Sequence, residues 1–156
     1  MIWKPHVTVA AIAERDGRFL MVEEEVRGRR VLNNPAGHLE PSENFLDAVR
    51  RETLEETGWE FEPDTVIGIY LWKNELDKTM LRVAFHGHCS LHHPHRPLDK
   101  DILGAHWLSR VELTSGAHNL RSPMVLCCID DYLAGRRYPL ELLTHLTELP
   151  ATAGKA

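Results

Sequence analysis

The stretch GHLEPSENFLDAVRRETLEETGW, residues 37–59, decides how the chain is expected to fold. Two prolines bracket Gly37, so the segment that contains it cannot form a regular helix. Ser42 is a residue type that caps helix N-termini, and the acidic residue after it favours a first helical turn. The stretch therefore predicts an irregular loop followed by a helix over residues 43–57, with Gly58 as its C-terminal stop.

Three glutamates are the chemically informative feature of this helix. Glu52, Glu55 and Glu56 stand at positions i, i+3 and i+4, which fall within about one third of the helix circumference. Residues that can face a core occupy the adjoining arc: Leu46, Val49, Thr53 and Thr57. Like charges at this spacing destabilise a helix unless a cation neutralises them. Oxygen ligands favour Mg²⁺, with Mn²⁺ as a substitute, whereas a solvated acidic face is the alternative interpretation.

The residues around the glutamates favour the metal site. Gly37 is expected on the loop just before the helix, where its backbone carbonyl could point at the same ion. Arg51 is expected on another face of the helix, within reach of Asp47 one turn back and Glu43 two turns back. Such a pairing would brace the loop against the helix.

This stretch resembles the signature of the Nudix hydrolase family. That signature is Gly, five residues, Glu, seven residues, Arg-Glu, an aliphatic residue, any residue, Glu-Glu, any residue, Gly and an aliphatic residue. Here it reads Gly37, Glu43 and then RETLEETGW over residues 51–59, so every charged and glycine position fits. Thr53 and Trp59 depart from the two aliphatic positions, which puts the packing of the helix in doubt but not the metal chemistry.

The resemblance implies a fold and a set of roles. The expected fold is α+β, a Nudix α/β/α sandwich with a mixed β-sheet. Glu52, Glu55 and Glu56 would be metal ligands and would carry the catalysis, helped by the carbonyl of Gly37. Glu43 and Arg51 would form a structural pair that supports the catalytic helix.

Further stretches resemble one bacterial phosphatase subgroup of the family. They are KPHVTVA (4–10), PAGHLE (35–40), NLRSP (119–123) and RYPLE (137–141). The resemblance implies hydrolysis of nucleoside tri- and diphosphates with release of inorganic phosphate, and of hydroxymethylpyrimidine diphosphate, a thiamine precursor. The alternatives are a Nudix pyrophosphatase that acts on a nucleotide sugar, a dinucleoside polyphosphate or a capped RNA end, and a non-catalytic Nudix binding module.

The rest of the chain predicts strands around two helices. Ser122-Pro123 is typical of a helix start, so a second helix is expected from there to about Ala134. Strands are predicted at residues 6–13, 19–23, 31–33, 65–72, 80–89 and 104–108. This order of strands and helices indicates an α+β fold or a mixed sheet with flanking helices. We expect one domain over residues 1–149, followed by a disordered tail over 150–156.

Some residues outside the signature are candidates for the remaining roles. Within the signature, Glu55 or Glu56 could act as the general base through the metal shell. Asp99 and Asp101, in a polar loop, are the other candidates for this base, although a solvated turn explains them at least as well. Trp3 and Trp72 could stack on a base, with packing over the sheet as the alternative. Arg121 directly precedes the second helix, whose N-terminus favours anions, and could hold phosphate.

A run of histidines has a second metal-binding pattern. His86 and His88 share one face of a predicted strand, and three more histidines follow in the next loop. Such spacing could bind Zn²⁺ or Ni²⁺ adventitiously. The sequence leaves open whether this cluster binds a metal.

Composition restricts the partners. The net charge of −5 is unfavourable for binding a nucleic acid duplex or an anionic membrane, so a small-molecule nucleotide or diphosphate is the expected partner. Three cysteines, two of them adjacent, do not suggest disulfides and indicate a reducing cytoplasm. The subgroup resemblance implies a monomer.

Overall fold

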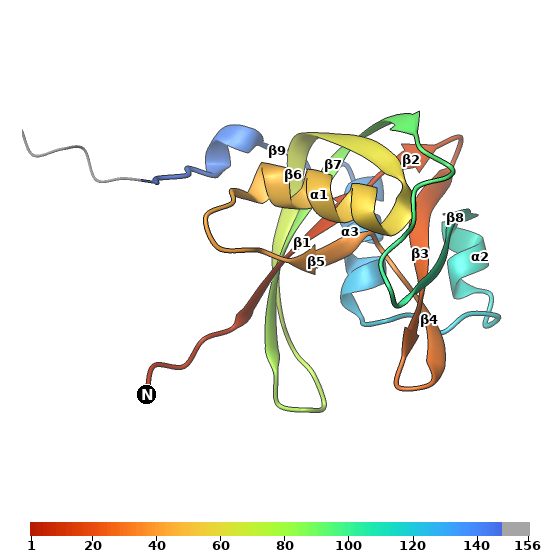
Figure 1. Ribbon diagram of the computed structural model, residues 1–156, viewed down its shortest axis with the longest axis horizontal. Coiled ribbons are helices and arrows are strands. Elements are labelled where there is room, and N and C mark those ends of the chain that lie inside the picture. Colours follow the sequence, from red (N-terminus) through yellow and green to blue (C-terminus); the bar gives the residue numbers. More distant parts are fainter. Residues whose placement is uncertain (148–156) are drawn as a thin grey trace, which may run out of the picture.

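The computed structural model describes residues 1–147 and centres on a five-stranded mixed sheet (Figure 1). In spatial order its strands are β5 (Ala36–His38), β1 (His6–Ile12), β7 (Thr79–His92), β6 (Trp59–Lys73) and β9 (Tyr138–Pro139). Strands β1 and β7 are parallel, while the other neighbours are antiparallel. The tail expected at residues 150–156 lies outside the described residues.

A second, antiparallel sheet forms around β3 (Arg18–Val26). Its other strands, β2 (Glu14–Arg15), β4 (Arg29–Asn33) and β8 (Ile102–Ser109), all pair with β3. Asp16 and Gly17 turn the chain into β3 with φ of 52° and 75°, as a two-residue turn with both centres left-handed requires. The predicted strands at 19–23, 31–33 and 104–108 are thus confirmed, with wider bounds.

Two helices cover opposite faces of the mixed sheet (Figure 1). Helix α1 (Phe45–Thr57) packs its Val49 with Val9 of β1, whereas α3 (Met124–Leu133) packs its Ile129 with Ala10. Successive residues of β1 point to opposite faces, which is why both neighbours are buried. The α/β/α sandwich is confirmed. Within residues 1–147, no helix is long and apolar enough to cross a membrane.

The start of α1 differs from the prediction. Ser42 does not cap the helix, because its φ is 67° and it lies in the turn before it. Asn44 is the cap instead, and its side chain accepts a hydrogen bond of 2.8 Å from the Asp47 amide. Gly58 ends the helix as expected, with φ of 74° and its amide donating to the Leu54 carbonyl.

Other boundaries were wrong where pairing partners override local patterns. Strands β6 and β7 are longer than the predicted 65–72 and 80–89, because bulges keep them paired past Pro63. Pro123 takes the capping position of α3, although the Ser122 hydroxyl accepts from the Met124 amide at 3.2 Å. Helix α2 (Arg110–Thr114) and the 3₁₀ helix Leu140–Leu142 are too short to leave a readable periodicity.

Candidate active site

Strand β5 and helix α1 are in close contact at the candidate active site. A Cβ on Gly37 would lie 2.0 Å from the carboxyl carbon of Glu52, so only glycine leaves room for that side chain. One residue earlier, the Ala36 amide donates a 2.8 Å hydrogen bond to Glu56. Glu52 and Glu56 are only 8% and 6% exposed. Strand β5 therefore holds two of the three helix carboxylates, those of Glu52 and Glu56, in position.

Arg51 connects the loop to the carboxylates. Its guanidinium donates two hydrogen bonds, of 3.0 and 2.7 Å, to the carboxylate of Glu43. It also reaches Glu52 at 2.8 Å and Glu55 at 3.2 Å. These contacts lower the pKa of Glu43 and raise the pKa of Arg51, since the guanidinium hydrogen-bonds the Glu43 carboxylate. Asp47, also expected within reach of Arg51, pairs with the neighbouring arginine instead.

Asp99 joins the glutamates from the loop after β7. One carboxylate oxygen each from Glu52, Glu55 and Asp99 lie within 4.8 Å of one another. The Asp99 amide also donates to the Glu55 carbonyl at 3.0 Å, which ties this loop to the helix. Asp101, the other aspartate singled out in this loop, is not in this group, and its carbonyl accepts from the Glu25 amide.

The carboxylates share a strongly negative environment. Burial, more than any neighbour, raises the pKa of Glu52, and it raises the pKa of Glu56 to about 9; nearby carboxylates, including Asp99, add to both effects. A hard divalent cation would relieve both the desolvation and the repulsion. The donor set consists of carboxylate oxygens, which suits such an ion. The arrangement can therefore hold a divalent metal beside the core.

The two departures from the family signature are accommodated locally. Thr53 is fully buried, and its hydroxyl donates to the Val49 carbonyl at 2.7 Å, so its polar group is satisfied inside the helix. Trp59 stacks on His92 with ring centroids 4.4 Å apart and lies edge-on to Trp107. Helix packing is thus intact at both positions.

Two cavities share several lining residues, and the smaller one reaches strand β5. The larger, of about 670 Å³, is lined by the β3–β4 turn, the β6–β7 turn and the segment before α3. The smaller, of about 160 Å³, includes Ala36 and Gly37 in its lining. Trp72 and Arg121 line both. Trp3 is 65% exposed and lines neither of these two cavities.

The smaller cavity also contains residues that the sequence interpretation missed. Arg82, on β7, is 3% exposed and donates to Asn34 at 2.9 Å and to Asn33 at 3.2 Å, while its Nε lacks a partner within the described residues. Glu24 lines the same space, and burial raises its pKa. One signal could have found Arg82, because it is the single charged residue in the apolar run LRVAF of 81–85.

The comparison with protein families agrees with this geometry. The NUDIX domain model matches residues 4–126, which include β5, α1 and the Asp99 loop. The chain belongs to the Nudix family. It is a Nudix phosphohydrolase, a class of enzyme that generally needs a divalent metal.

Individual relatives place the chain within the Nudix family. It is 41% identical over 142 residues to the protein named Phosphatase NudJ of Escherichia coli strain K12, covering 91% of this chain and 92% of that protein. A solved NUDIX hydrolase from Nitrosomonas europaea is 46% identical and superposes with a TM-score of 0.89, covering 92% of this chain and 98% of that one. A MutT NUDIX hydrolase from Burkholderia pseudomallei, at 20% identity and a TM-score of 0.70 (83% and 98% coverage), shares the fold.

Proposed function

We propose that this Nudix enzyme hydrolyses phosphoanhydride bonds of nucleoside tri- and diphosphates and releases inorganic phosphate. The observation that carries the proposal is the carboxylate group of Glu52, Glu55 and Asp99 beside the cavity-lining Gly37. The similarity to the phosphatase NudJ over nearly the whole chain supports phosphate as the product. We extend the proposal to hydroxymethylpyrimidine diphosphate, which presents the same anhydride bond on a pyrimidine.

The proposed metal is Mg²⁺, with Mn²⁺ as a substitute. Glu52, Glu55 and Glu56 would hold it, together with the backbone carbonyl of Gly37. When bound, such an ion supplies positive charge to the phosphate oxygens and lowers the pKa of water. Arg51 and Glu43 keep the carboxylates in place, because the guanidinium bridges the loop and two of the ligands.

The general base is proposed to be Asp99. It stands within 4.8 Å of two proposed ligands, close enough to take a proton from a water held there. Asp101 remains the comparison residue, because it belongs to the same loop without joining the carboxylate group.

Substrate binding is proposed for the two cavities. Trp72 would stack on the base, and Arg121 would hold phosphate oxygens, since both line the space that reaches Gly37. Trp3 was the other stacking candidate; its exposed position on the N-terminal arm supports this role less.

The proposal also includes the domain organisation, oligomeric state, location and type of partner of this protein. Residues 1–149 would form one domain that acts as a monomer in the cytoplasm. The net charge of −5 favours a small-molecule substrate over a nucleic acid duplex or a membrane surface.

Product analysis of a substrate panel tests the proposal. The panel comprises nucleoside di- and triphosphates, hydroxymethylpyrimidine diphosphate, a nucleotide sugar, a dinucleoside polyphosphate and a capped RNA end, each with Mg²⁺ and with chelator. We expect chelator-sensitive release of inorganic phosphate from the nucleoside di- and triphosphates and from hydroxymethylpyrimidine diphosphate. Pyrophosphate or two phosphorylated fragments would indicate the alternative Nudix pyrophosphatase. Binding without turnover of any member would indicate a non-catalytic module.

A further inference from the structure

A second group of metal-type ligands lies on the opposite face of the mixed sheet from helix α1. It consists of Asp64 on β6 and of His86 and His88 on β7. The two histidines alternate with Gly87 and continue the face of Ala84, which packs with α3. The ring of His86 stacks on Tyr132 of α3, with centroids 4.9 Å apart. This cluster is therefore separate from the glutamates of α1.

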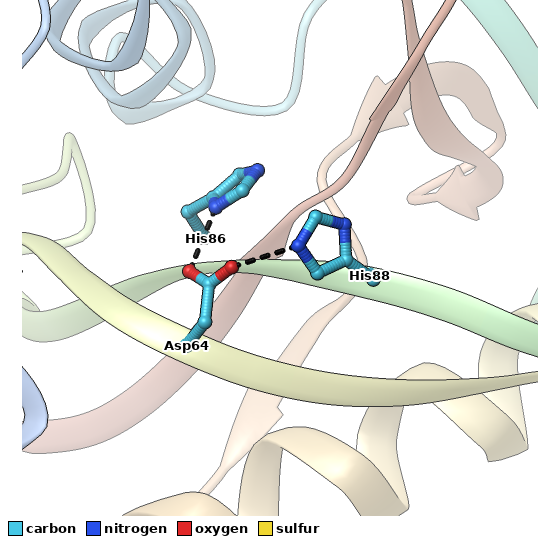
Figure 2. A group of neighbouring side chains, drawn as sticks. All are labelled: Asp64, His86 and His88. Carbon is cyan, nitrogen blue, oxygen red and sulfur yellow. Dashed lines mark hydrogen bonds and ion pairs between the residues drawn. The ribbon is translucent and has the colours of Figure 1, made fainter.

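A β-bulge brings the aspartate to the histidines. Pro63 pairs with Gly87 and Thr65 pairs with His86, so Asp64 is an extra residue between them. The bulge turns its side chain toward the two imidazoles, as Figure 2 shows. Gly87 permits this approach, because a Cβ there would lie 2.2 Å from the Glu62 carbonyl oxygen.

The three side chains converge on one point (Figure 2). One carboxylate oxygen of Asp64 lies 2.8 Å from Nδ1 of His86, and the other lies 2.9 Å from Nε2 of His88. One ligand atom from each residue falls within 4.8 Å of the other two. These are the atoms that would face a shared ion.

The surroundings hold the ligands in position. The Thr65 hydroxyl donates to Asp64 at 3.1 Å, and Tyr132 restricts the ring of His86 by stacking. The side chain of His86 is 13% exposed, while that of His88 is 74% exposed, so the group is anchored on one side and open to solvent on the other. Partners of this kind orient metal ligands and raise affinity.

We propose that Asp64, His86 and His88 bind a Zn²⁺-class transition metal ion at the β6–β7 bulge. Two imidazole nitrogens and one carboxylate oxygen are ligands that Zn²⁺ accepts in a tetrahedral site, whereas Mg²⁺ prefers oxygen alone. Three protein ligands leave the fourth position to water. The ion would hold β6 and β7 together at the bulge and stabilise the packing of Tyr132. This role would be independent of hydrolysis on the α1 face of the sheet.

Zinc titration of the chelator-stripped, dialysed full chain tests this site. Excess Mg²⁺ is present in the buffer to occupy the carboxylate site of α1. Calorimetry in this buffer, with Zn²⁺ as the only titrant and no nucleotide, measures the affinity and stoichiometry of Zn²⁺ binding. His88→Gln is the main variant, because this side chain is 74% exposed and has little packing to lose; Asp64→Asn is the second. His95→Gln, an exposed histidine of the following loop outside the group, is the matched control.

The proposal predicts binding of about one Zn²⁺ per chain, weakened at least about 100-fold in both variants and unchanged in the control. Zinc should also raise the melting temperature of the wild type and the control but not of His88→Gln. The same titration in a Glu52→Gln, Glu56→Gln background should give the same affinity. Equal binding by all variants, loss of binding in that background, or only weak unsaturable binding would each overturn the proposal.

Discussion

Gly37 and Glu52 are in such close contact that the glycine is part of the carboxylate site. A Cβ at position 37 would meet the carboxyl carbon of Glu52 at 2.0 Å and both of its oxygens at 2.2 Å. Strand β5 holds Gly37 opposite Val9, so the backbone there cannot simply move away. The side chain of Glu52 would have to move instead, out of its place beside Glu55 and Asp99.

Gly37→Ala should therefore damage the site more than the fold. We expect metal-dependent turnover to fall by about 100-fold, since a displacement on the order of 1 Å at catalytic groups has that effect. Mg²⁺ affinity should fall as well, while circular dichroism should remain that of a folded protein. Gly104→Ala is the control, because its Cβ would find its nearest neighbour at an ordinary 3.5 Å. Equal turnover in the two variants would contradict this account.

Arg51→Lys should weaken both stability and activity. A lysine cannot make the two parallel hydrogen bonds to Glu43 while also reaching Glu52. We expect a loss of about 1–3 kcal/mol in the free energy of unfolding, measured with urea. The neighbouring Arg50 is a matched control, because it also pairs with two carboxylates but only outside the site.

The comparison of the two arginine variants tests whether the position of Arg51 matters, because both substitutions keep the positive charge. Arg50→Lys should leave turnover unchanged within about twofold, as exposed ion pairs contribute little. If Arg50→Lys reduced turnover as much as Arg51→Lys, the bridging role of Arg51 would be refuted.

Stability of the metal-free enzyme should depend on Glu56. Burial raises the pKa of Glu56 from 4.5 to about 9, so between these values the folded protein keeps a proton that the unfolded chain releases. Stability in chelator must then fall as the pH rises from about 4.5 to 9. Glu56→Gln removes this term and should stabilise the metal-free protein at pH 8 by at least about 1 kcal/mol.

Urea unfolding across this pH range checks the sign. The raised pKa values of Glu24 and Glu52 act in the same direction, so the slope should become shallower in Glu56→Gln without vanishing. Glu55→Gln, at a more exposed carboxylate, is the control. A slope as steep in Glu56→Gln as in the wild type would show that this carboxyl is ionised in the metal-free protein.

Trp72 and Trp3 should differ as substrate contacts. Stacking on a base contributes about 1–3 kcal/mol, so Trp72→Leu should raise KM for nucleotides by about tenfold or more with little change in kcat. Trp3→Leu should have a smaller effect, because Trp3 lines neither of the two cavities proposed to bind the substrate. Steady-state kinetics would contradict the assignment if Trp3→Leu had the larger effect on KM.

The helix of the site could be predicted because its signals are local. The period of the helix places Glu52, Glu55 and Glu56 on one side, and the left-handed conformation of Gly58 ends the helix. Its start was misplaced by two residues, because Ser42 and Asn44 are both good caps and only the loop conformation decides between them.

Contacts between distant strands could not be predicted in the same way. Asp64 reaches His86 only because a bulge shifts the register of β6 against β7, and no pattern in either strand encodes that shift. Asp99 and Asp101 looked alike in the sequence, and the backbone bond from Asp99 to Glu55 distinguishes them. Arg82 differs from these residues, because a single charge within an apolar strand can be recognised from the sequence as a candidate functional residue.

Release of phosphate and pyrophosphate, measured side by side from one nucleoside triphosphate with Mg²⁺, tests the central claim most directly. Wild type and Glu52→Gln are compared, each with and without chelator. We predict inorganic phosphate as the product of the wild type, abolished by chelator and reduced at least about 100-fold in the variant. Phosphate release that persists in Glu52→Gln or in chelator would contradict hydrolysis at the α1 carboxylates.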